Sequence, residues 1–231
     1  MPDQEYVESE PVRLAYRVVD AGPAEATPMV LLHGGGGDST TYDSLAPAFA
    51  ARRRVYLPDL RGMGRSDRVG PYSLRIMRDD ISRFLDDQGL DRAILLGHSL
   101  GAFVAMLATQ SAPDRVSALV LEECPPPVPL NLPVPTDVPD TAPYYDRAIR
   151  PFVLAELNAP DPLWWEALAG LSVPTLVLSG GPTSFLPQET VARFAARLPA
   201  GQLVTIAAGH HIHANDPAAF TDAVETFLAQ N

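Results

Sequence analysis

The sequence predicts an α/β domain with a mostly parallel central sheet and helices on both faces. Short apolar runs alternate with runs of helical period along nearly the whole chain, which is the pattern of βαβ units. The 231 residues, 46% apolar and 19% charged, suit one folded domain of ordinary to large size. A glycine-flanked turn also joins one apolar run directly to a helix-like run. We therefore treat 1–231 as a single domain.

The expected elements follow in chain order. Strands are expected at residues 12–19, 29–32, 54–57, 93–96, 116–121, 175–178 and 203–206. Helices are expected at residues 40–51, 73–88, 100–111, 187–197 and 217–229. Several ends carry their own signals: Ser73 can cap the second helix, Gly89 ends it, and Pro113 follows the end of the third.

One segment departs from this alternation. Residues 124–162 contain 11 of the 24 prolines, and proline removes a backbone donor and fixes φ, so this stretch is not a core strand. The segment is too long for an ordinary loop, and the α/β pattern resumes after it. We predict a short lid inserted into the domain at 124–168.

Composition excludes several classes of function. The net charge of -11 repels phosphate backbones and anionic lipid, which disfavours nucleic-acid and membrane-surface partners. A single cysteine, Cys124, permits neither an intrachain disulfide nor a cysteine-rich metal site. The sequence has no apolar run of about 18 residues and begins without a signal-peptide pattern, so a cytoplasmic location is expected. Oligomeric state is not predicted.

The strongest motif is Gly97-His98-Ser99-Leu100-Gly101, a G-x-S-x-G. It lies between an expected strand and an expected helix, where such a sharp turn needs small residues on both sides of the serine. This context predicts that Ser99 is an exposed nucleophile on a strained turn. The alternative is a glycine turn that starts a helix and has no chemistry.

A serine nucleophile needs a base within hydrogen-bond reach. His98 lies inside the motif and is expected to pack beneath the site, and His33 precedes a glycine run where it can fix a turn. The remaining histidines, His210, His211 and His213, follow an expected strand and open toward the same sheet edge as Ser99. We predict His210 as the base. The alternatives are solvated loop residues or a weak metal cluster, although carboxylate or cysteine partners at ligand spacing are not evident.

Backbone donors for an oxyanion are also available. His33 and the run Gly34 to Gly37 follow an expected strand and offer unhindered N–H groups, and the N–H of Leu100 stands at a helix N-terminus. A phosphate cradle is the alternative. The run lacks both the Gly-Lys-Ser/Thr ending of a P-loop and the spacing of a dinucleotide fold.

Taken together, these motifs resemble the α/β-hydrolase fold family over nearly the whole chain, and in particular its compact, cofactor-free esterase, lactonase and haloperoxidase-like branch. The motifs are His33-Gly34-Gly35, Pro58-Asp59-Leu60-Arg61-Gly62-Met63-Gly64-Arg65-Ser66, the Ser99 motif, Val173-Pro174-Thr175-Leu176-Val177-Leu178 and Gly209-His210.

The resemblance implies Ser99 as nucleophile, His210 as base, and the N–H groups of Leu100 and Gly35 as oxyanion hole, with Gly36 as a substitute for Gly35. It implies hydrolysis of a carboxylic ester, lactone or related acyl bond through an acyl-enzyme, with no metal or organic cofactor.

The acid of the expected triad departs from the family pattern. Its usual position, in the turn after the strand at 175–178, is occupied by Thr183, and the next carboxylate is Glu189. Some family members carry the acid one strand earlier. There this chain has Glu122 and Glu123, which strand alternation directs to opposite faces, and Glu123 matches the relocated position. We therefore predict that Glu123 orients His210; the alternative is a structural bond from Glu123 to backbone or arginine.

The substrate is expected to be a small molecule with an apolar part. Gly36 and His98 are expected to contact it, together with Trp164 and Trp165 under the lid, near Phe152 and the Tyr144–Tyr145 pair. The aromatic residues could equally form the core of the lid. The missing carboxylate at Thr183 leaves a second functional class open: a non-hydrolytic member of the fold, either a natural-product cyclase or a small-ligand binder.

Overall fold

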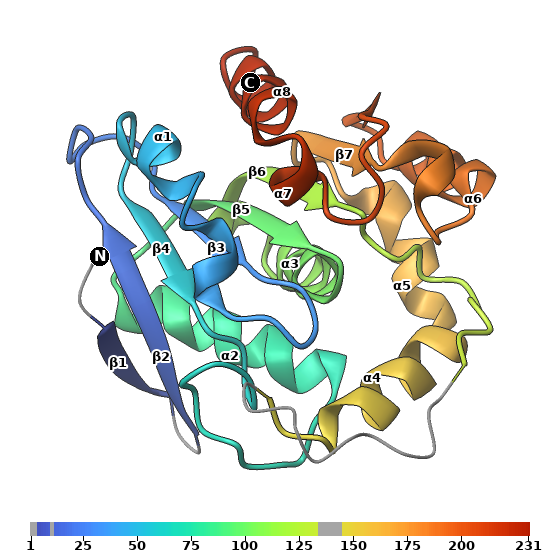
Figure 1. Ribbon diagram of the computed structural model, residues 1–231, viewed down its shortest axis with the longest axis horizontal. Coiled ribbons are helices and arrows are strands. Elements are labelled where there is room, and N and C mark those ends of the chain that lie inside the picture. The colour runs from blue at the N-terminus through green and yellow to red at the C-terminus, as the bar shows by residue number, and fades with distance from the viewer. Residues whose placement is uncertain (1–3, 10–11, 134–144) are drawn as a thin grey trace.

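The computed structural model describes residues 4–9, 12–133 and 145–231. One sheet runs through the molecule in the order β1-β2-β4-β3-β5-β6-β7-β8 (Figure 1). Its strands are β1 (Gln4–Ser9), β2 (Val12–Val19), β3 (Met29–Leu32), β4 (Val55–Pro58), β5 (Ala93–His98), β6 (Val116–Glu122), β7 (Thr175–Ser179) and β8 (Gly201–Thr205).

The sheet is mostly parallel, as predicted. Only β2 runs against its neighbours, pairing antiparallel with both β1 and β4. The pairings from β4 through β8 are all parallel. Parallel strands that are covered on both faces become almost uniformly apolar, and every residue of β3, β4 and β5 is buried.

Helices cover both faces of this sheet, also as predicted (Figure 1). Apolar residues of α2, α3 and α6 form one core with the sheet, and those of α1 and α8 form a second core on the other face. The α-helices are α1 (Ala46–Ala50), α2 (Leu74–Asp87), α3 (Leu100–Ser111), α4 (Ile149–Asn158), α5 (Pro162–Ala167), α6 (Gln188–Arg197), α7 (Ile212–Asn215) and α8 (Pro217–Leu228).

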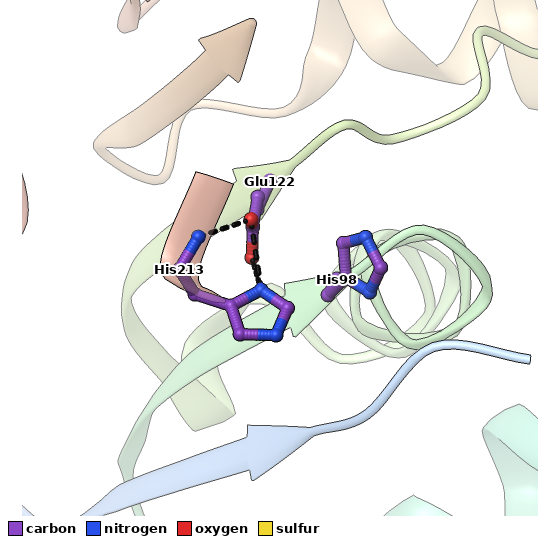
Figure 2. Close-up of side chains that lie close together, drawn as sticks. All are labelled: His98, Glu122 and His213. Atoms are coloured by element: carbon purple, nitrogen blue, oxygen red, sulfur yellow. Dashed lines mark hydrogen bonds and ion pairs between the residues drawn. The ribbon is translucent and has the colours of Figure 1, made fainter. Parts of the chain in front are cut away.

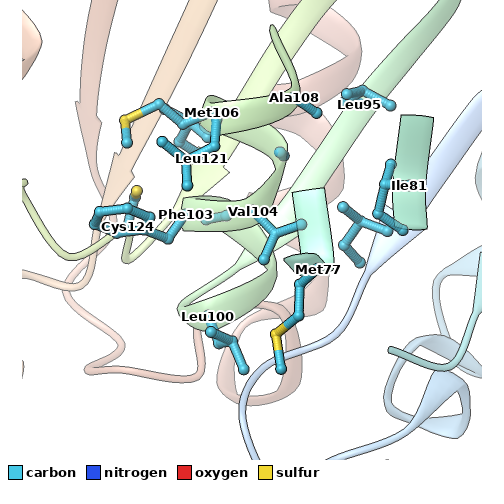
Figure 3. Packing of buried hydrophobic residues seen from close by; sticks show 14 of the residues in the cluster. Met77, Ile81, Leu95, Leu100, Phe103, Val104, Met106, Ala108, Leu121 and Cys124 are labelled. Atoms are coloured by element: carbon cyan, nitrogen blue, oxygen red, sulfur yellow. The ribbon is translucent and has the colours of Figure 1, made fainter. Parts of the chain in front are cut away.

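Helix α3 is the central element of the first core. Its residues from Leu100 to Thr109 are all buried, as expected of a helix that is apolar all round. Figure 3 shows its side chains between β6 and α2, with Phe103 near Leu121 on one side and Val104 near Met77 on the other. This packing fixes the helix, and with it the turn that precedes Leu100.

The structure differs from the sequence prediction in several elements. Strand β1 was not expected, because its run of six residues is short and rich in polar side chains; it is the edge strand, where only one side needs a partner. The helix expected at 40–51 is a 3₁₀ turn (Ser39–Tyr42) followed by α1, whose first turn holds Pro47. Helices α4 and α5 form inside the proline-rich segment, and Pro162 starts α5.

Candidate active site

The site lies where the loops after β3 and β5 separate. These strands are neighbours, but the chain leaves β3 toward β4 on one side and leaves β5 toward β6 on the other. In a parallel sheet, such a switch point opens a crevice at the carboxyl ends of the strands. The loop after β3 contains Gly35 and Gly36, and the turn after β5 contains Ser99.

Ser99 adopts a backbone conformation that non-glycine residues rarely use. Its φ is 50° and its ψ is -113°. The flanking glycines allow the turn, since a Cβ on Gly97 would lie 2.4 Å from the Ala102 nitrogen and one on Gly101 would lie 2.2 Å from the Leu32 oxygen. The strained turn is held by the Ser99 N–H, which donates to the Glu122 carbonyl at 2.9 Å. Ser99 therefore lies on a strained strand-to-helix turn at the start of α3, which is the geometry that a nucleophile elbow requires.

His210 and Glu123 are hydrogen-bonded to each other. The distance from His210 Nδ1 to Glu123 Oε2 is 3.0 Å, and the Glu123 side chain is completely buried whereas that of His210 is 18% exposed. Because Nδ1 donates to the carboxylate, Nε2 is left as the proton acceptor of a neutral imidazole.

The Glu123 carboxylate has two further donors. The Gly180 N–H donates to Oε1 at 2.6 Å, and the Ser184 hydroxyl donates to Oε2. Glu123 itself has a positive φ of 48°, and its N–H donates to the Leu178 carbonyl at 2.9 Å. With His210 Nδ1, three donors therefore surround this buried carboxylate. The sequence analysis left open a structural bond from Glu123 to backbone or arginine. In the structure Glu123 bonds the His210 side chain as well as the Gly180 backbone N–H.

The turn after β7 supplies no carboxylate to this histidine. Thr183 is exposed at the end of a 3₁₀ turn (Gly181–Thr183), and Glu189 is exposed in the first turn of α6. The same turn nevertheless takes part, since Gly180 and Ser184 donate to Glu123.

Gly35 and Gly36 differ in how available their N–H groups are to an oxyanion. Gly35 lies beside Leu100, since a Cβ on Gly35 would be 3.6 Å from the Leu100 side chain. The Gly36 N–H already donates to the Met63 sulfur at 3.3 Å, which favours Gly35 over Gly36. The loop is fixed by His33, whose Nδ1 donates to the Gly34 carbonyl at 2.8 Å and whose Nε2 accepts from the Leu60 N–H at 2.9 Å. Burial lowers the pKa of His33 and keeps the ring neutral.

A cavity of about 470 Å³ opens over Ser99. Most of its lining comes from the segment predicted as a lid, and Arg150 is its only charged side chain among the described residues. The lining residues are Gly35, Gly36, Ser99, Leu100, Pro125, Leu132, Tyr145, Ile149, Arg150, Val153, Leu154, Leu157 and Phe185.

Several residues expected to contact substrate lie elsewhere. Trp164 is buried against Phe103 of α3, with ring centroids 5.4 Å apart. Trp165 lies beneath the guanidinium of Arg197, at 5.5 Å. Neither lines the cavity, because α5 lies against α3 and α6 rather than over Ser99.

The other aromatic residues that were expected near the substrate lie in different places. Phe152 is exposed on α4, Tyr145 lines the cavity, and Tyr144 lies outside the described residues. The lining face of α4 was missed by the sequence analysis. Its signal was the spacing of Ile149, Val153 and Leu157, one helical turn apart on a single face.

His98 also lies away from the cavity, in a buried cluster with Glu122 and His213 (Figure 2). The ligand-type atoms of the three residues all lie within 4.8 Å of one another, so they are the set among the described residues that could hold a metal ion. The donor and acceptor groups already bond to each other and to the backbone: His213 Nδ1 donates to Glu122 at 2.8 Å, and His98 Nε2 donates to the His210 carbonyl at 2.8 Å. This arrangement fits a hydrogen-bonded cluster better than a preformed metal site.

The family model described as alpha/beta hydrolase fold matches residues 27–172. The chain belongs to this family, and it is an enzyme of the hydrolase class. No helix in the described part of the chain is long and apolar enough to cross a membrane.

Individual relatives extend the likeness to the full length. The chain is 29% identical over 272 residues to the sn-1-specific diacylglycerol lipase ABHD11 of Mus musculus, covering 98% of this chain and 88% of that protein. A hydrolase from Pseudomonas aeruginosa PA01 has a TM-score of 0.84 and 25% identity, with 98% of both chains covered. The carboxylesterase CesB from Bacillus subtilis shares the fold, with a TM-score of 0.78, 20% identity and coverage of 100% of this chain and 93% of its own.

Proposed function

We propose that the protein hydrolyses a carboxylic ester, lactone or related acyl bond through an acyl-enzyme on Ser99. His210 is the general base and Glu123 the acid that orients it. The N–H groups of Leu100 and Gly35 form the oxyanion hole. The observation that carries the proposal is the 3.0 Å hydrogen bond between His210 Nδ1 and the buried Glu123. The strained Ser99 lines the same cavity as Phe185, whose ring centroid lies 4.5 Å from that of His210.

The chemistry follows from the tautomer that this bond selects. Glu123 holds the proton of His210 on Nδ1, so Nε2 can take the proton of the Ser99 hydroxyl as Oγ attacks the carbonyl carbon. The oxygen of the tetrahedral intermediate becomes negative and accepts hydrogen bonds from the two N–H groups. Collapse breaks the bond to the leaving alcohol, which receives the proton from His210. Water then repeats the sequence on the acyl-enzyme and releases the carboxylic acid.

The Ser99 hydroxyl has no hydrogen-bond partner among the described residues. Catalytic hydrogen bonds are often long before substrate binds and tighten in the complex. In the proposed mechanism, the hydrogen bond from the Ser99 hydroxyl to His210 Nε2 therefore forms when substrate binds.

The cavity favours an apolar acyl group. Its walls above Ser99 are formed by Ile149, Val153 and Leu157 of α4, with Leu132 and Phe185 nearby. The volume of about 470 Å³ lies within the range of small-molecule sites. Each methylene of an acyl chain that is buried against this surface makes the free energy of binding more favourable by about 0.8 kcal/mol.

The non-hydrolytic alternative rested on the missing carboxylate at Thr183. In our proposal Glu123 supplies that carboxylate from the end of a different strand, and its bond to His210 supports hydrolysis over a cyclase or a simple binding protein.

Hydrolysis of p-nitrophenyl butyrate and covalent labelling by a fluorophosphonate test the proposal. The Ser99→Ala variant is expected to lose turnover by about 10⁴-fold or more and to lose labelling. Ser111→Ala is a matched control, since it removes a hydroxyl from the far end of the same helix, where Ser111 bonds only the Ala108 carbonyl. Retention of both activity and labelling by Ser99→Ala would refute the proposed nucleophile.

A further inference from the structure

Glu122, the last residue of β6, and Glu123, which follows it, bind two histidines of the segment after β8: His213 on α7 and His210 in the loop before α7. Glu123 binds His210, and Glu122, the preceding residue, points to the other face of the sheet and binds His213. Its Oε1 accepts from the His213 backbone N–H at 2.9 Å, and its two oxygens lie 2.9 and 2.8 Å from His213 Nδ1. The segment formed by the His210 loop and α7 is therefore attached to the end of β6 at two points three residues apart.

The Glu122–His213 pair is sealed from water. The side chain of Glu122 is completely buried and that of His213 is 1% exposed. The His213 ring packs against Tyr42 and Phe220, with ring centroids at 5.2 and 6.2 Å, and its Nε2 lies 3.3 Å from the Thr41 hydroxyl. Separating the pair would leave buried hydrogen-bonding groups without partners, which is costly, so the pair resists displacement of the segment that carries His213.

His98 attaches the same loop at a third point. It is the register partner of Glu122 across β5 and β6, and its Nε2 donates to the backbone carbonyl of His210 at 2.8 Å. Burial lowers the pKa of His98 well below its usual value, with the neighbouring His213 and His210 adding to the effect. The ring is therefore neutral, with its single proton on Nε2. Gly34 leaves space for this ring, since a Cβ there would lie 2.5 Å from His98 Nδ1.

None of the three side chains lines the cavity over Ser99. Figure 2 shows them grouped at the ends of β5 and β6, with His213 extending from α7 toward Glu122. Glu122 bonds the backbone N–H and the ring of His213, and His98 bonds the backbone carbonyl of His210. None of the three side chains takes a direct part in the proposed reaction.

We propose that Glu122, His213 and His98 form a buried positioning network that fixes the imidazole of His210 between Ser99 and Glu123. This inference rests on the proposed function, in which His210 moves the proton of Ser99. Proton transfer requires heavy atoms about 2.6–3.2 Å apart, and a misplacement of about 1 Å in a reacting group costs about 100-fold in rate. The bond from Glu123 restrains the ring, and the network restrains the backbone from which the ring extends.

The test compares His213→Leu with His213→Asn. Leucine removes the donor to Glu122, whereas the asparagine amide nitrogen occupies the position of Nδ1 and can restore the bond. We expect His213→Leu to lower kcat for p-nitrophenyl butyrate about 10- to 100-fold, with KM changed by less than about twofold. We expect His213→Asn to remain within about threefold of the native kcat.

A control separates positioning from loss of stability. Val224→Ala shortens a completely buried side chain of α8 in the same core. It is expected to lower Tm while leaving kcat unchanged. The second readout is the low-field proton NMR resonance of His210 Nδ1–H, assigned by its loss in His210→Gln; His213→Leu is expected to shift or broaden it, and Val224→Ala to leave it in place.

The proposal is overturned if His213→Leu lowers Tm as Val224→Ala does but keeps the native kcat and the native resonance. It is also overturned if the purified protein carries one equivalent of zinc that His213→Leu releases, since the three residues would then be metal ligands. If Ser99→Ala remains active, the proposed function fails instead, and the NMR comparison alone decides whether the network fixes His210.

Discussion

Replacing Glu123 with glutamine tests the acid of the site with a minimal change of shape. Each oxygen of Glu123 receives at least one donor: Gly180 N–H on Oε1, and the Ser184 hydroxyl and His210 Nδ1 on Oε2. In either orientation of the glutamine amide, its NH₂ group faces a donor. The conflict at His210 is relieved when the imidazole proton moves to Nε2, and this tautomer cannot accept the proton of Ser99.

The expected cost follows from that tautomer. Loss of the correct tautomer lowers kcat by about 10⁴-fold in a serine protease triad, which corresponds to about 5.4 kcal/mol in the activation free energy at about 1.36 kcal/mol per decade. We therefore expect Glu123→Gln to lower kcat for p-nitrophenyl butyrate by about 10³- to 10⁴-fold. KM should change little, since Glu123 does not line the cavity.

The assay is steady-state hydrolysis across pH, with Glu189→Gln as the control. Glu189 is an exposed carboxylate on α6, so its variant should match the native protein. The double variant Glu123→Gln, Thr183→Asp returns a carboxylate to the usual family position and is expected to recover part of the lost rate. Full turnover by Glu123→Gln, together with an inactive Ser99→Ala, would refute the role of Glu123.

Two further predictions concern the cavity and the dependence of stability on pH. Arg150 is the only charged residue among the described residues that line the cavity, so Arg150→Met is expected to weaken binding of an anionic substrate. For a p-nitrophenyl ester whose acyl chain ends in a carboxylate, KM should rise about three- to tenfold, whereas KM for p-nitrophenyl butyrate should stay the same. Equal effects on both esters would contradict this prediction. Because burial lowers the pKa of His33, the unfolded chain binds a proton below about pH 6.5 that the folded chain does not, so the free energy of unfolding should fall on acidification, by up to about 1.4 kcal/mol per pH unit for this group. Urea unfolding of His33→Gln should show a shallower dependence between pH 6.5 and 5, and an unchanged slope would count against the reasoning.

Local sequence patterns determined the fold and the position of the serine. The alternation of apolar and helical runs predicts the parallel sheet, and Gly97 and Gly101 predict the turn at Ser99, because both signals depend on residues that are neighbours along the chain. The glycine run after β3 was likewise found from residues that are neighbours along the chain. Strand β1 was missed because an edge strand needs only one buried face and carries little apolar signal.

For the acid of the predicted triad, the sequence offered Glu122 and Glu123. Alternation along β6 required opposite faces for these two carboxylates, and the family resemblance favoured Glu123. The sequence alone did not indicate that Glu122 would bind His213 on the other face, nor that His98 would bond the backbone of His210 instead of meeting substrate.

Tertiary structure decided which side chains meet across the molecule. The His210–Glu123 bond joins residues 87 apart in sequence, and the His213–Glu122 bond joins residues 91 apart. Such contacts depend on strand register, on the path of the loop after β8 and on the packing of α5 against α3, which also removed Trp164 from the cavity. Residue type and periodicity specify the local element, but a side chain's partners are fixed only when separate elements pack in one arrangement.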